Sequence, residues 1–428
     1  MQTMITREPR QTAKRLVIGR FSRGEQRSFS PHVTCWINPP FYERCSINRH
    51  STGKSALYLL GSMLLLLAIV VSGCNHALSP MPATPTPTPT TKAVEPLTAI
   101  EMLDEHQGWA LTATSILRTS DGGGHWKNVS PANVPYLLGL QGTFLTVSTA
   151  WVTAEMSESE PLRVLRTTDG GNHWDSISLP QIQGHFIGGP DFINPSDGWL
   201  EVKTVEATGN KGIAIYRTTD GGKTWRKVSS TTLQTGRAPG HLPWFGKKSG
   251  ISFLTAQTGW ATAGEATNIW FYVTHDGGVT WQPQPLTWPS GLVYPTATTI
   301  PPIFFGKDGL LPVLINDLTH HNLDLYVTHD GGVTWQSTSL TAPYSTSLTA
   351  SDMNHIWILD APSLAVTSDG GQHWNQFTPH ADFTNVSALD FISSRVGWAI
   401  GGLEPTQSLL LKTTDGGHLW TKITYSIS

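Results

Sequence analysis

Short runs of alternating apolar and polar residues recur along the chain from about residue 98 onward. In the last stretch of this kind the runs are 386–392, 396–400, 409–413 and 420–424. They are rich in β-branched and other apolar residues and are bounded by Gly, Ser and Asp, a pattern typical of β-strands joined by tight turns. The pattern therefore predicts groups of four short strands.

One octet, T-x-D-G-G-x-x-W, occurs seven times in this part of the chain. Its successive aspartates are 39 to 56 residues apart, and a fixed block at this period is typical of propeller-type repeats. The aspartates are Asp121, Asp169, Asp220, Asp276, Asp330, Asp369 and Asp415. The terminal tryptophans are Trp126, Trp174, Trp225, Trp281, Trp335, Trp374 and Trp420.

A second and weaker mark, Gly-Trp-Ala or a variant of it, stands 12 to 21 residues before each aspartate. In the fifth repeat it has become Gly309-Leu310-Leu311. Its tryptophans in the other repeats are Trp109, Trp151, Trp199, Trp260, Trp357 and Trp398. Two independent marks in the same order predict seven equivalent repeats.

The Asp-Gly-Gly of each octet is a hairpin signal between the third and fourth strands. Glycine supplies the positive φ of the turn, and the aspartate accepts hydrogen bonds from the turn's own amides. We expect the terminal tryptophan to fill space between neighbouring sheets. Because one four-stranded sheet cannot bury both of its faces alone, seven must stack in a ring.

The predicted fold is thus all-β: a seven-bladed β-propeller of four-stranded antiparallel blades. An N-terminal hydrophobic helix and a Pro/Thr-rich linker precede it. The domains are a basic, disordered extension (1–55), a hydrophobic segment (56–73), a Pro/Thr-rich stalk (74–97) and the propeller (98–428). Packing of the first blade on the last is sufficient to close such a ring without strand exchange.

The 18 uncharged residues of 56–73 follow several basic residues, and Cys74 comes directly after them. This arrangement has the n-region and h-region of an export signal. The junction Val71-Ser72-Gly73-Cys74 resembles the bacterial lipoprotein signal, which implies cleavage before Cys74 and lipidation of its thiol. The alternative is an uncleaved transmembrane helix, since 18 residues just reach spanning length. Both alternatives place the remaining chain outside the cytoplasmic membrane, at its outer face or at the cell surface.

Composition supports a protein of many short strands joined by tight turns. Only 14% of residues are charged, whereas Gly (41), Pro (29) and Trp (17) are plentiful. Residues 1–55 hold ten Lys/Arg against three Asp/Glu, and the remainder holds 18 against 28. Nucleic acid is excluded as a partner because an acidic body does not attract phosphate. All three cysteines, Cys35, Cys45 and Cys74, precede the repeats, which therefore hold no disulfide.

The octets resemble Asp-box (BNR) repeats, with the consensus S/T-x-D-x-G-x-T-W. Residues 98–428 as a whole resemble single seven-bladed Asp-box propellers, notably the photosystem II stability/assembly factor family. That family has the same Gly-Trp-Ala mark and Thr-Thr-Asp-Gly-Gly block, and its bacterial members include lipoproteins. The resemblance implies a non-catalytic assembly or scaffolding role and a monomer. The chain departs from the consensus where His125, His173, His373 and Leu419 replace the Thr before Trp.

Glycoside hydrolysis is the enzymatic alternative, because sialidases and xyloglucanases also carry Asp boxes. The seven aspartates belong to equivalent turns, one per blade, so they lie too far apart for a carboxylate pair. Arg118, Arg166 and Arg217 directly precede boxes. We expect them to point outward in parallel instead of converging on a substrate carboxylate. The remaining candidate carboxylates are Glu155, Glu158, Glu160 and Glu265.

Sixteen histidines raise the question of a metal site. Six are dispersed among the boxes, and His320-His321 lacks the i, i+4 spacing that places two imidazoles on one metal. Gly122-Gly123-Gly124 is followed by a strand and not by a helix N-terminus, so it is no phosphate loop. We therefore expect neither a metal nor a cofactor.

Two long links between blades, Ser229–Gly250 and Gln282–Pro302, flank the fourth blade on the face opposite the boxes. Aromatic and cationic residues on loops over a rigid scaffold are typical of recognition surfaces. The candidate binding residues are Arg237, His241, Trp244, Phe245, Lys247, Lys248, Trp288 and Tyr294. They predict a protein or glycan ligand. The alternatives are that the links pack down as a local cap and that the protein is a structural surface protein with no specific ligand.

Overall fold

A computed structural model describes residues 94–428, apart from short stretches within that range. These stretches are 133–137, 156–160, 180–184, 187, 204–211, 233–234, 266–267, 319–320, 346 and 403–407. The basic extension, the hydrophobic segment with Cys74, and the stalk up to residue 93 lie outside the described residues. No helix in the part of the chain that the structure describes has the length and apolar character needed to cross a membrane.

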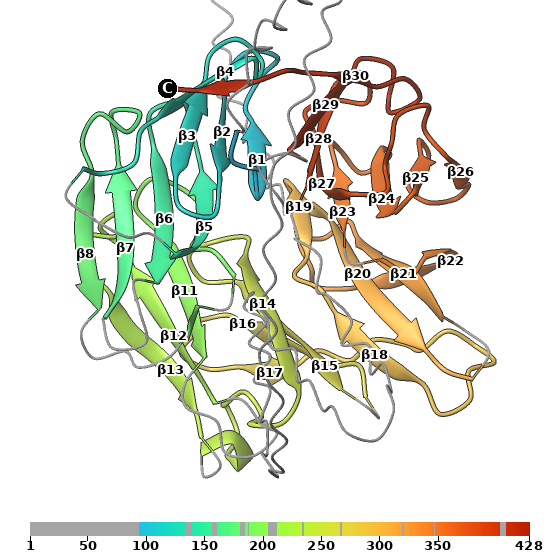
Figure 1. Cartoon of the computed structure of the whole chain (residues 1–428). Helices are drawn as coiled ribbons and strands as arrows, with labels where there is room; N and C mark the ends of the chain where they lie inside the picture. Colours follow the sequence, from blue (N-terminus) through green and yellow to red (C-terminus); the bar gives the residue numbers. More distant parts are fainter. Residues whose placement is uncertain are drawn as a thin grey trace, which may run out of the picture. The chain divides into compact units, whose positions relative to one another are not determined.

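The described residues form seven antiparallel four-stranded units in sequence order, which we call blades one to seven (Figure 1). Blades one to three contain β1 (Ala99–Met102), β2 (Gly108–Leu111), β3 (Ile116–Thr119), β4 (His125–Asn128), β5 (Leu138–Phe144), β6 (Ala150–Glu155), β7 (Leu162–Thr167), β8 (Asp175–Leu179), β9 (His185–Phe186), β10 (Asp191–Phe192), β11 (Gly198–Lys203), β12 (Ile213–Thr218) and β13 (Arg226–Thr231). The prediction of an all-β protein made of four-stranded antiparallel sheets is confirmed.

Blades four and five are joined into one nine-stranded sheet. Their strands are β14 (Lys247–Phe253), β15 (Gly259–Glu265), β16 (Phe271–Thr274), β17 (Gln282–Pro283), β18 (Thr296–Thr299), β19 (Ile303–Phe305), β20 (Asp308–Asn316), β21 (His321–Thr328) and β22 (Gln336–Pro343). In blades three and five the first strand is broken in two, so that β9 and β10 both pair with β11, and β18 and β19 both pair with β20.

Blades six and seven complete the succession of sheets. They contain β23 (Leu348–Ala350), β24 (Ile356–Asp360), β25 (Ser363–Thr367), β26 (Asn375–Phe377), β27 (Val386–Phe391), β28 (Gly397–Gly401), β29 (Leu409–Thr413) and β30 (Thr421–Lys422), followed by β31 (Ser426–Ile427). In each blade the turns between strands one and two and the octets between strands three and four lie at one end, here called the box face. The hairpins between strands two and three and the links between blades lie at the other end, here called the link face.

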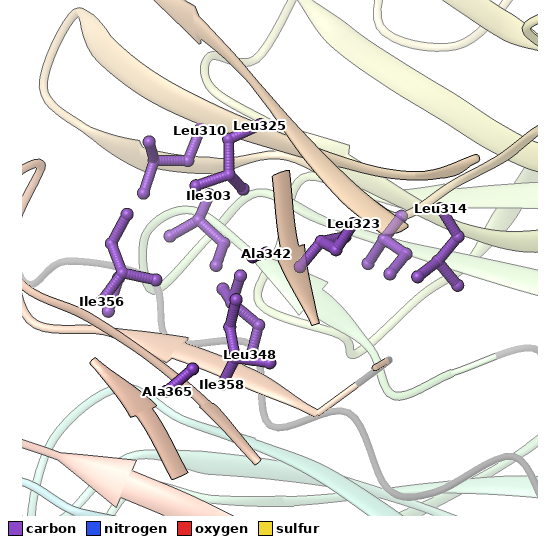
Figure 2. Packing of buried hydrophobic residues seen from close by; sticks show 12 residues of the cluster. Ile303, Leu310, Leu314, Leu323, Leu325, Ala342, Leu348, Ile356, Ile358 and Ala365 are labelled. Atoms are coloured by element: carbon purple, nitrogen blue, oxygen red, sulfur yellow. The ribbon is translucent and has the colours of Figure 1, made fainter. Parts of the chain in front are cut away.

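Seven apolar clusters join the blades in a cycle. Each cluster combines side chains of two consecutive blades, and one of them joins blade seven to blade one. The second strand shows how alternation produces this arrangement: Leu200 of β11 packs toward blade two, whereas its neighbour Trp199 packs toward blade four. The cluster between blades five and six is built mainly of aliphatic side chains, because the second-strand tryptophan is replaced by Leu310 there (Figure 2).

The second-strand tryptophans also form hydrogen bonds across the interfaces. The indole N–H groups of Trp151, Trp199, Trp357 and Trp398 donate to Gly221, Gly277, Gly416 and Gly122, at 2.7 to 3.0 Å. Each acceptor is the carbonyl of the first glycine in the octet of the following blade. The second mark of one repeat therefore binds the octet of another, and Trp398 extends this connection from blade seven to blade one.

Two of the three arginines that precede octets, Arg118 and Arg217, do not point outward as the sequence predicts, whereas Arg166 donates to the carboxylate of Asp175 on the neighbouring strand, at 3.1 Å. Arg118 and Arg217 lie over the second-strand tryptophans of their own blades, 5.3 and 5.2 Å from the ring centroids. Arg118 also donates to the carbonyl of Gly170 in the next octet, at 3.3 Å. These side chains are drawn inward because the indole face attracts a cation. They therefore help to join neighbouring blades.

Closure of the ring also differs from the simple packing that the sequence suggested. Strand β31 pairs in parallel with β4, the outer strand of blade one, in the register Ser426↔His125 and Ile427↔Trp126. The hydroxyl of Tyr425 donates to the carbonyl of Glu95, at 2.9 Å. Residues at the two ends of the repeat array thus belong to one sheet. Two hydrogen-bonded residues were too short a run to be recognised as a strand in the sequence.

The interblade indoles lead to a first prediction. Trp151 is fully buried, stacks on Phe192 with 3.7 Å between ring centroids and donates to Gly221 at 2.7 Å. We expect Trp151→Phe to lower the free energy of unfolding by about 2–3 kcal/mol, because it creates a cavity and leaves a carbonyl unpaired. Chemical denaturation of the purified protein measures this loss.

The octet tryptophan Trp225 provides the control. It is only partly buried, and its indole N–H donates to Gly222 of its own octet. Trp225→Phe should therefore lower the free energy of unfolding by no more than about 1 kcal/mol. Equal losses in the two variants would contradict a special role for the second-strand indole.

Candidate functional site

The octets form seven copies of one hydrogen-bonded turn. In each, the Thr hydroxyl donates to the Asp carboxylate at 2.7–3.0 Å. The amide of the second glycine donates to the Thr hydroxyl at 2.8–3.0 Å. The amide four residues after the aspartate donates back to its carboxylate at 2.9–3.0 Å. Each carboxylate is therefore engaged by its own turn.

These contacts determine the charge state of the octet aspartates. Hydrogen bonds from the amide and imidazole of His173 lower the pKa of Asp169 to about 2, and His373 does the same for Asp369. Hydrogen bonds from Thr334 lower the pKa of Asp330 to about 2. In Asp220 burial is the largest single contribution and raises the pKa, but the hydrogen bonds from Thr224 and the rest of the turn together outweigh it and lower the pKa to about 2. A carboxylate held ionised in this way is a poor general acid, because that role requires a pKa near the working pH.

Two of the three histidines that replace threonine in the octets take over its hydrogen bond, whereas the ring of His125 instead contacts the hydroxyls of Ser426 and Ser428, at 2.8 and 3.1 Å. The imidazole Nδ1 of His173 and that of His373 lie 2.6 Å from the second carboxylate oxygen of their aspartates. The Thr224 hydroxyl makes the equivalent contact at 2.6 Å. The replacement therefore preserves the turn. Among the described residues no group of three or more His, Cys, Asp or Glu side chains is arranged to hold a metal ion.

The first long link is shorter than the sequence suggested, because β13 extends to Thr231 and β14 begins at Lys247. Arg237, at the end of the short helix η1 (Thr235–Arg237), is exposed, as are Phe245 and Lys247. His241 and Trp244 are only partly exposed. The link also covers the core beneath it, since Leu242 is fully buried in the cluster between blades three and four.

Lys248 does not lie on the surface, where the sequence predicts it. Its side chain is buried, with 6% relative exposure, and its ammonium donates to the carbonyls of Phe245 and Gly246, at 2.6 and 3.0 Å. Alternation along β14 explains the difference, because Lys247 and Lys248 must point to opposite faces of the strand. Of these two lysines, only Lys247 faces solvent.

The second long link is divided by an unexpected strand. Strand β18 pairs with β15 on one side and with β20 on the other, and it thereby joins blades four and five. The link that remains, 284–295, packs down through Trp288, which contacts the cluster between these blades. The hydroxyl of Tyr326 donates to the carbonyl of Thr287 at 2.7 Å and anchors the link further. Trp288 therefore supports the alternative in which this link packs down as a local cap.

Tyr294 lies at the outer side of this link and is 91% exposed. Its φ of 51° is in the left-handed region, which a bulky aromatic residue rarely adopts and which costs on the order of 1 kcal/mol. This conformation does not bury the Tyr294 ring, so no apolar packing offsets its cost. The strained backbone and the exposed ring make Tyr294 a candidate for contact with another molecule.

Three further exposed apolar side chains lie near Tyr294 on the link face, and the sequence analysis missed them: Val293, Leu318 and Tyr344, exposed by 44%, 85% and 37%. The amide of Val293 donates to Asp317 in the hairpin that carries Leu318, at 2.8 Å. Tyr344 stacks on His321 at the other end of that hairpin, with 3.7 Å between centroids. Apolar residues outside the strand pattern were the signal that could have identified them.

Phe245 is connected to the same area through the sheet that blades four and five share. The register places Lys247 opposite Gly264, Gly264 opposite Thr298, and Thr298 opposite Leu314. Phe245 precedes this row by two residues and is 40% exposed. We call Phe245, Val293, Tyr294, Leu318 and Tyr344 the link-face patch.

The carboxylates considered for hydrolysis do not form a described pair. Glu155 ends β6 and accepts a hydrogen bond from the amide of Phe186, at 3.0 Å. Glu265 ends β15 in another blade, and Glu158 and Glu160 lie outside the described residues. The structure adds Glu201, which is 1% exposed on β11, and burial raises its pKa to about 8. A glutamate two positions after Trp199, where the other repeats have Leu, Thr, Pro or Ile, was the available signal.

The aspartate pKa values lead to a second prediction, on acid stability. Because the folded pKa of Asp220 is about 2, against an ordinary value of 3.8, its ionised form stabilises the fold above pH 3.8. This contribution is lost as the pH falls from about 4 to 2. We expect Asp220→Asn to lower the melting temperature at neutral pH, and the difference from the wild type to shrink between pH 4 and pH 2. Thermal melts across this range measure it.

The control for this experiment is Glu105→Gln, a change of an exposed carboxylate in a turn of the box face. Its melting temperature should follow that of the wild type at every pH. A constant difference between Asp220→Asn and the wild type down to pH 2 would contradict the assigned role of the octet carboxylate.

Residues 89–240 match the family model of the photosynthesis system II assembly factor YCF48, and residues 272–283 match that of the BNR/Asp-box repeat. The fold is similar to that of a solved structure described as YCF48 bound to D1 peptide, with a TM-score of 0.50 and 20% identity over 76% of this chain and 94% of that one. It is also similar to the GH74 xyloglucanase from Xanthomonas campestris, with a TM-score of 0.50 and 15% identity over 77% of this chain and 54% of that one. No curated protein matches the chain. The expected resemblance to the photosystem II assembly factors and to Asp-box repeats is thus confirmed, and the fold is a β-propeller of the kind found in YCF48.

Proposed function

We propose that this protein is a non-catalytic, membrane-anchored propeller that binds a protein segment on its link face and acts as an assembly factor or scaffold. The observation that carries the proposal is the link-face patch. Its five apolar side chains lie on three links and one hairpin around blades four and five. Exposed apolar side chains that gather on one face of a protein are candidates for a binding surface.

The two faces of the ring differ in a way that supports this assignment. On the box face the polar groups of the octets are satisfied within their own turns, as the hydrogen bonds of Asp121 and Thr119 illustrate. On the link face the connections differ in length from blade to blade and carry exposed aromatic residues. Variable loops on a rigid scaffold are where propellers and similar folds place recognition.

The nature of the ligand is inferred from chemistry and from similarity. Tyrosine and phenylalanine are enriched at protein interfaces, where they supply large contact areas at small entropic cost. The similar structure of YCF48 is described as bound to a D1 peptide. We infer that a peptide segment, not a glycan, binds to the link face of this protein.

Membrane attachment is proposed from the sequence alone. The uncharged segment 56–73 followed by Cys74 supports export, cleavage and lipidation, with the Pro/Thr-rich stalk separating the propeller from the bilayer. We expect mass spectrometry of the mature N-terminus to find a lipid-modified Cys74, which would place the propeller on the outer face of the cytoplasmic membrane. An intact Met1 would show that the segment is retained as a single-pass anchor.

The third prediction tests the binding face by photo-crosslinking from defined positions. Tyr294 of the full-length protein is replaced by a photoreactive phenylalanine derivative, and cells are irradiated. We expect a discrete protein adduct, since position 294 is exposed on the link face. Adding Phe245→Ser should lower the adduct yield about fivefold or more, because loss of one aromatic contact at an interface costs on the order of 1 kcal/mol or more.

Val333 and Leu419 provide the matched control on the box face. Both are apolar and exposed, by 72% and 61%. The same photoreactive residue at position 333 should give no discrete protein adduct, and Leu419→Ser should leave the yield from position 294 unchanged. Equal adducts from both faces, or a sugar polymer as the only captured molecule, would contradict the proposal.

A further inference from the structure

Lys248 lies beneath the link-face patch and binds the turn that carries Phe245. Its ammonium donates to the carbonyls of Phe245 and Gly246, at 2.6 and 3.0 Å. It also lies 4.7 Å from the centroid of the Trp270 ring. One buried cation thus contacts the turn and the core below it.

The turn is constrained in a second way, by its close approach to Trp270. Gly246 has a φ of 88°, and a Cβ at this position would lie 3.1 Å from the Trp270 ring. The backbone therefore approaches the indole closely, and Phe245 is held at the edge of the turn with 40% of its surface exposed. The orientation of Phe245 depends on the two carbonyls that Lys248 binds.

Glu201 accompanies Lys248 in the interface between blades three and four. It is 1% exposed, and neither of its carboxylate oxygens has a hydrogen-bond partner among the described residues. The charged groups that act on the ammonium are Glu201 from β11 and Glu265 from β15. Two strands therefore place carboxyl groups near a single cation, and burial raises the pKa of one of them, Glu201, to about 8.

Such an arrangement is costly if its only role is to fill the core. Burying an ammonium and an unpartnered carboxyl opposes folding, and apolar residues of similar volume are often equally or more stabilising. Other blades have an apolar residue at the position of Glu201: Leu111 and Ile400 occupy it and are buried in the clusters of their interfaces. What the lysine provides, and an apolar side chain cannot, is the pair of hydrogen bonds to the turn.

We propose that Lys248 is a positioning residue of the binding surface: from its buried site beside Glu201 it fixes the Phe245 turn in the orientation that a partner contacts. Its importance for binding rests on the function proposed above, whereas its effect on the turn does not. Because the ammonium does not reach the surface, it acts through the backbone of residues 245–246 and makes no contact with the partner.

The fourth prediction concerns Lys248→Met in the full-length protein. Hydrogen exchange followed by mass spectrometry should show exchange of the amides in 235–247 accelerated about tenfold or more, because two hydrogen bonds from a charged donor are lost. Exchange in the second link, 284–295, should be unchanged. Lys248→Arg keeps a cationic donor and should restore most of the protection.

Lys412 offers a matched control on the box face. Its ammonium also lies 4.7 Å from a tryptophan centroid, that of Trp398, and it donates to the carbonyl of Glu105 at 3.4 Å. Lys412→Met should leave exchange in 235–247 unchanged. Unaltered exchange in Lys248→Met, or equal acceleration in both variants, would overturn the positioning role.

The photo-crosslinking yield from position 294 separates this inference from the proposed function. We expect Lys248→Met to lower the yield and Lys248→Arg to restore it. If exchange in 235–247 accelerates while the yield stays unchanged, Lys248 orders the turn but the partner does not use it. If the photoreactive residue at position 294 gives no adduct even when Lys248 is unchanged, the proposed function fails. The exchange result then still decides whether Lys248 fixes the turn.

Discussion

Each sheet of this propeller can bury its faces only against the sheets on either side, and the second-strand tryptophan is the residue that makes this contact specific. Its ring fills the space between blades, while its indole N–H binds the octet of the following blade in four of the interfaces. Apolar packing alone is non-directional. The hydrogen bond to a particular glycine carbonyl fixes the angle and register at which consecutive sheets meet, and so links the two repeated marks of the sequence.

The interface between blades five and six shows what happens where this contact is lost. Leu310 stands in place of the tryptophan, and the cluster is built largely of Ile, Leu and Ala (Figure 2). Blade five is instead joined to blade four by the hydrogen bonds of β18. The sheet that carries the least regular repeat is therefore held by backbone pairing with its neighbour, and the links around this double sheet bear the exposed aromatic residues.

The two faces of the ring use their side chains differently, and this difference underlies the proposed binding role of the link face. The box face uses its carboxylates and hydroxyls to complete its own turns, with Asp220 and Thr218 as one of seven copies. The link face instead exposes aromatic side chains, such as that of Tyr294, which is 91% exposed and adds almost nothing to the apolar core. Beneath it, Lys248 and Glu201 place ionisable groups in the interface between blades three and four. These departures from the repeat lie close together around blade four.

Local patterns were sufficient to predict the repeat, the strand composition of a blade and the role of the octet, because these depend on turn chemistry and on a period of two along each strand. They also indicated where the two long links lie, although both links are shorter than predicted. Features that depend on contacts between distant segments could be read only from the folded chain. Strand β31 joins blade one, β18 joins blades four and five, and Arg118 reaches the next octet. Whether Lys248 or Lys247 faced solvent depended on the register of β14. The link-face patch emerged only when the fold brought Leu318 and Tyr344 beside the link that carries Tyr294, since no local pattern records which loops become neighbours.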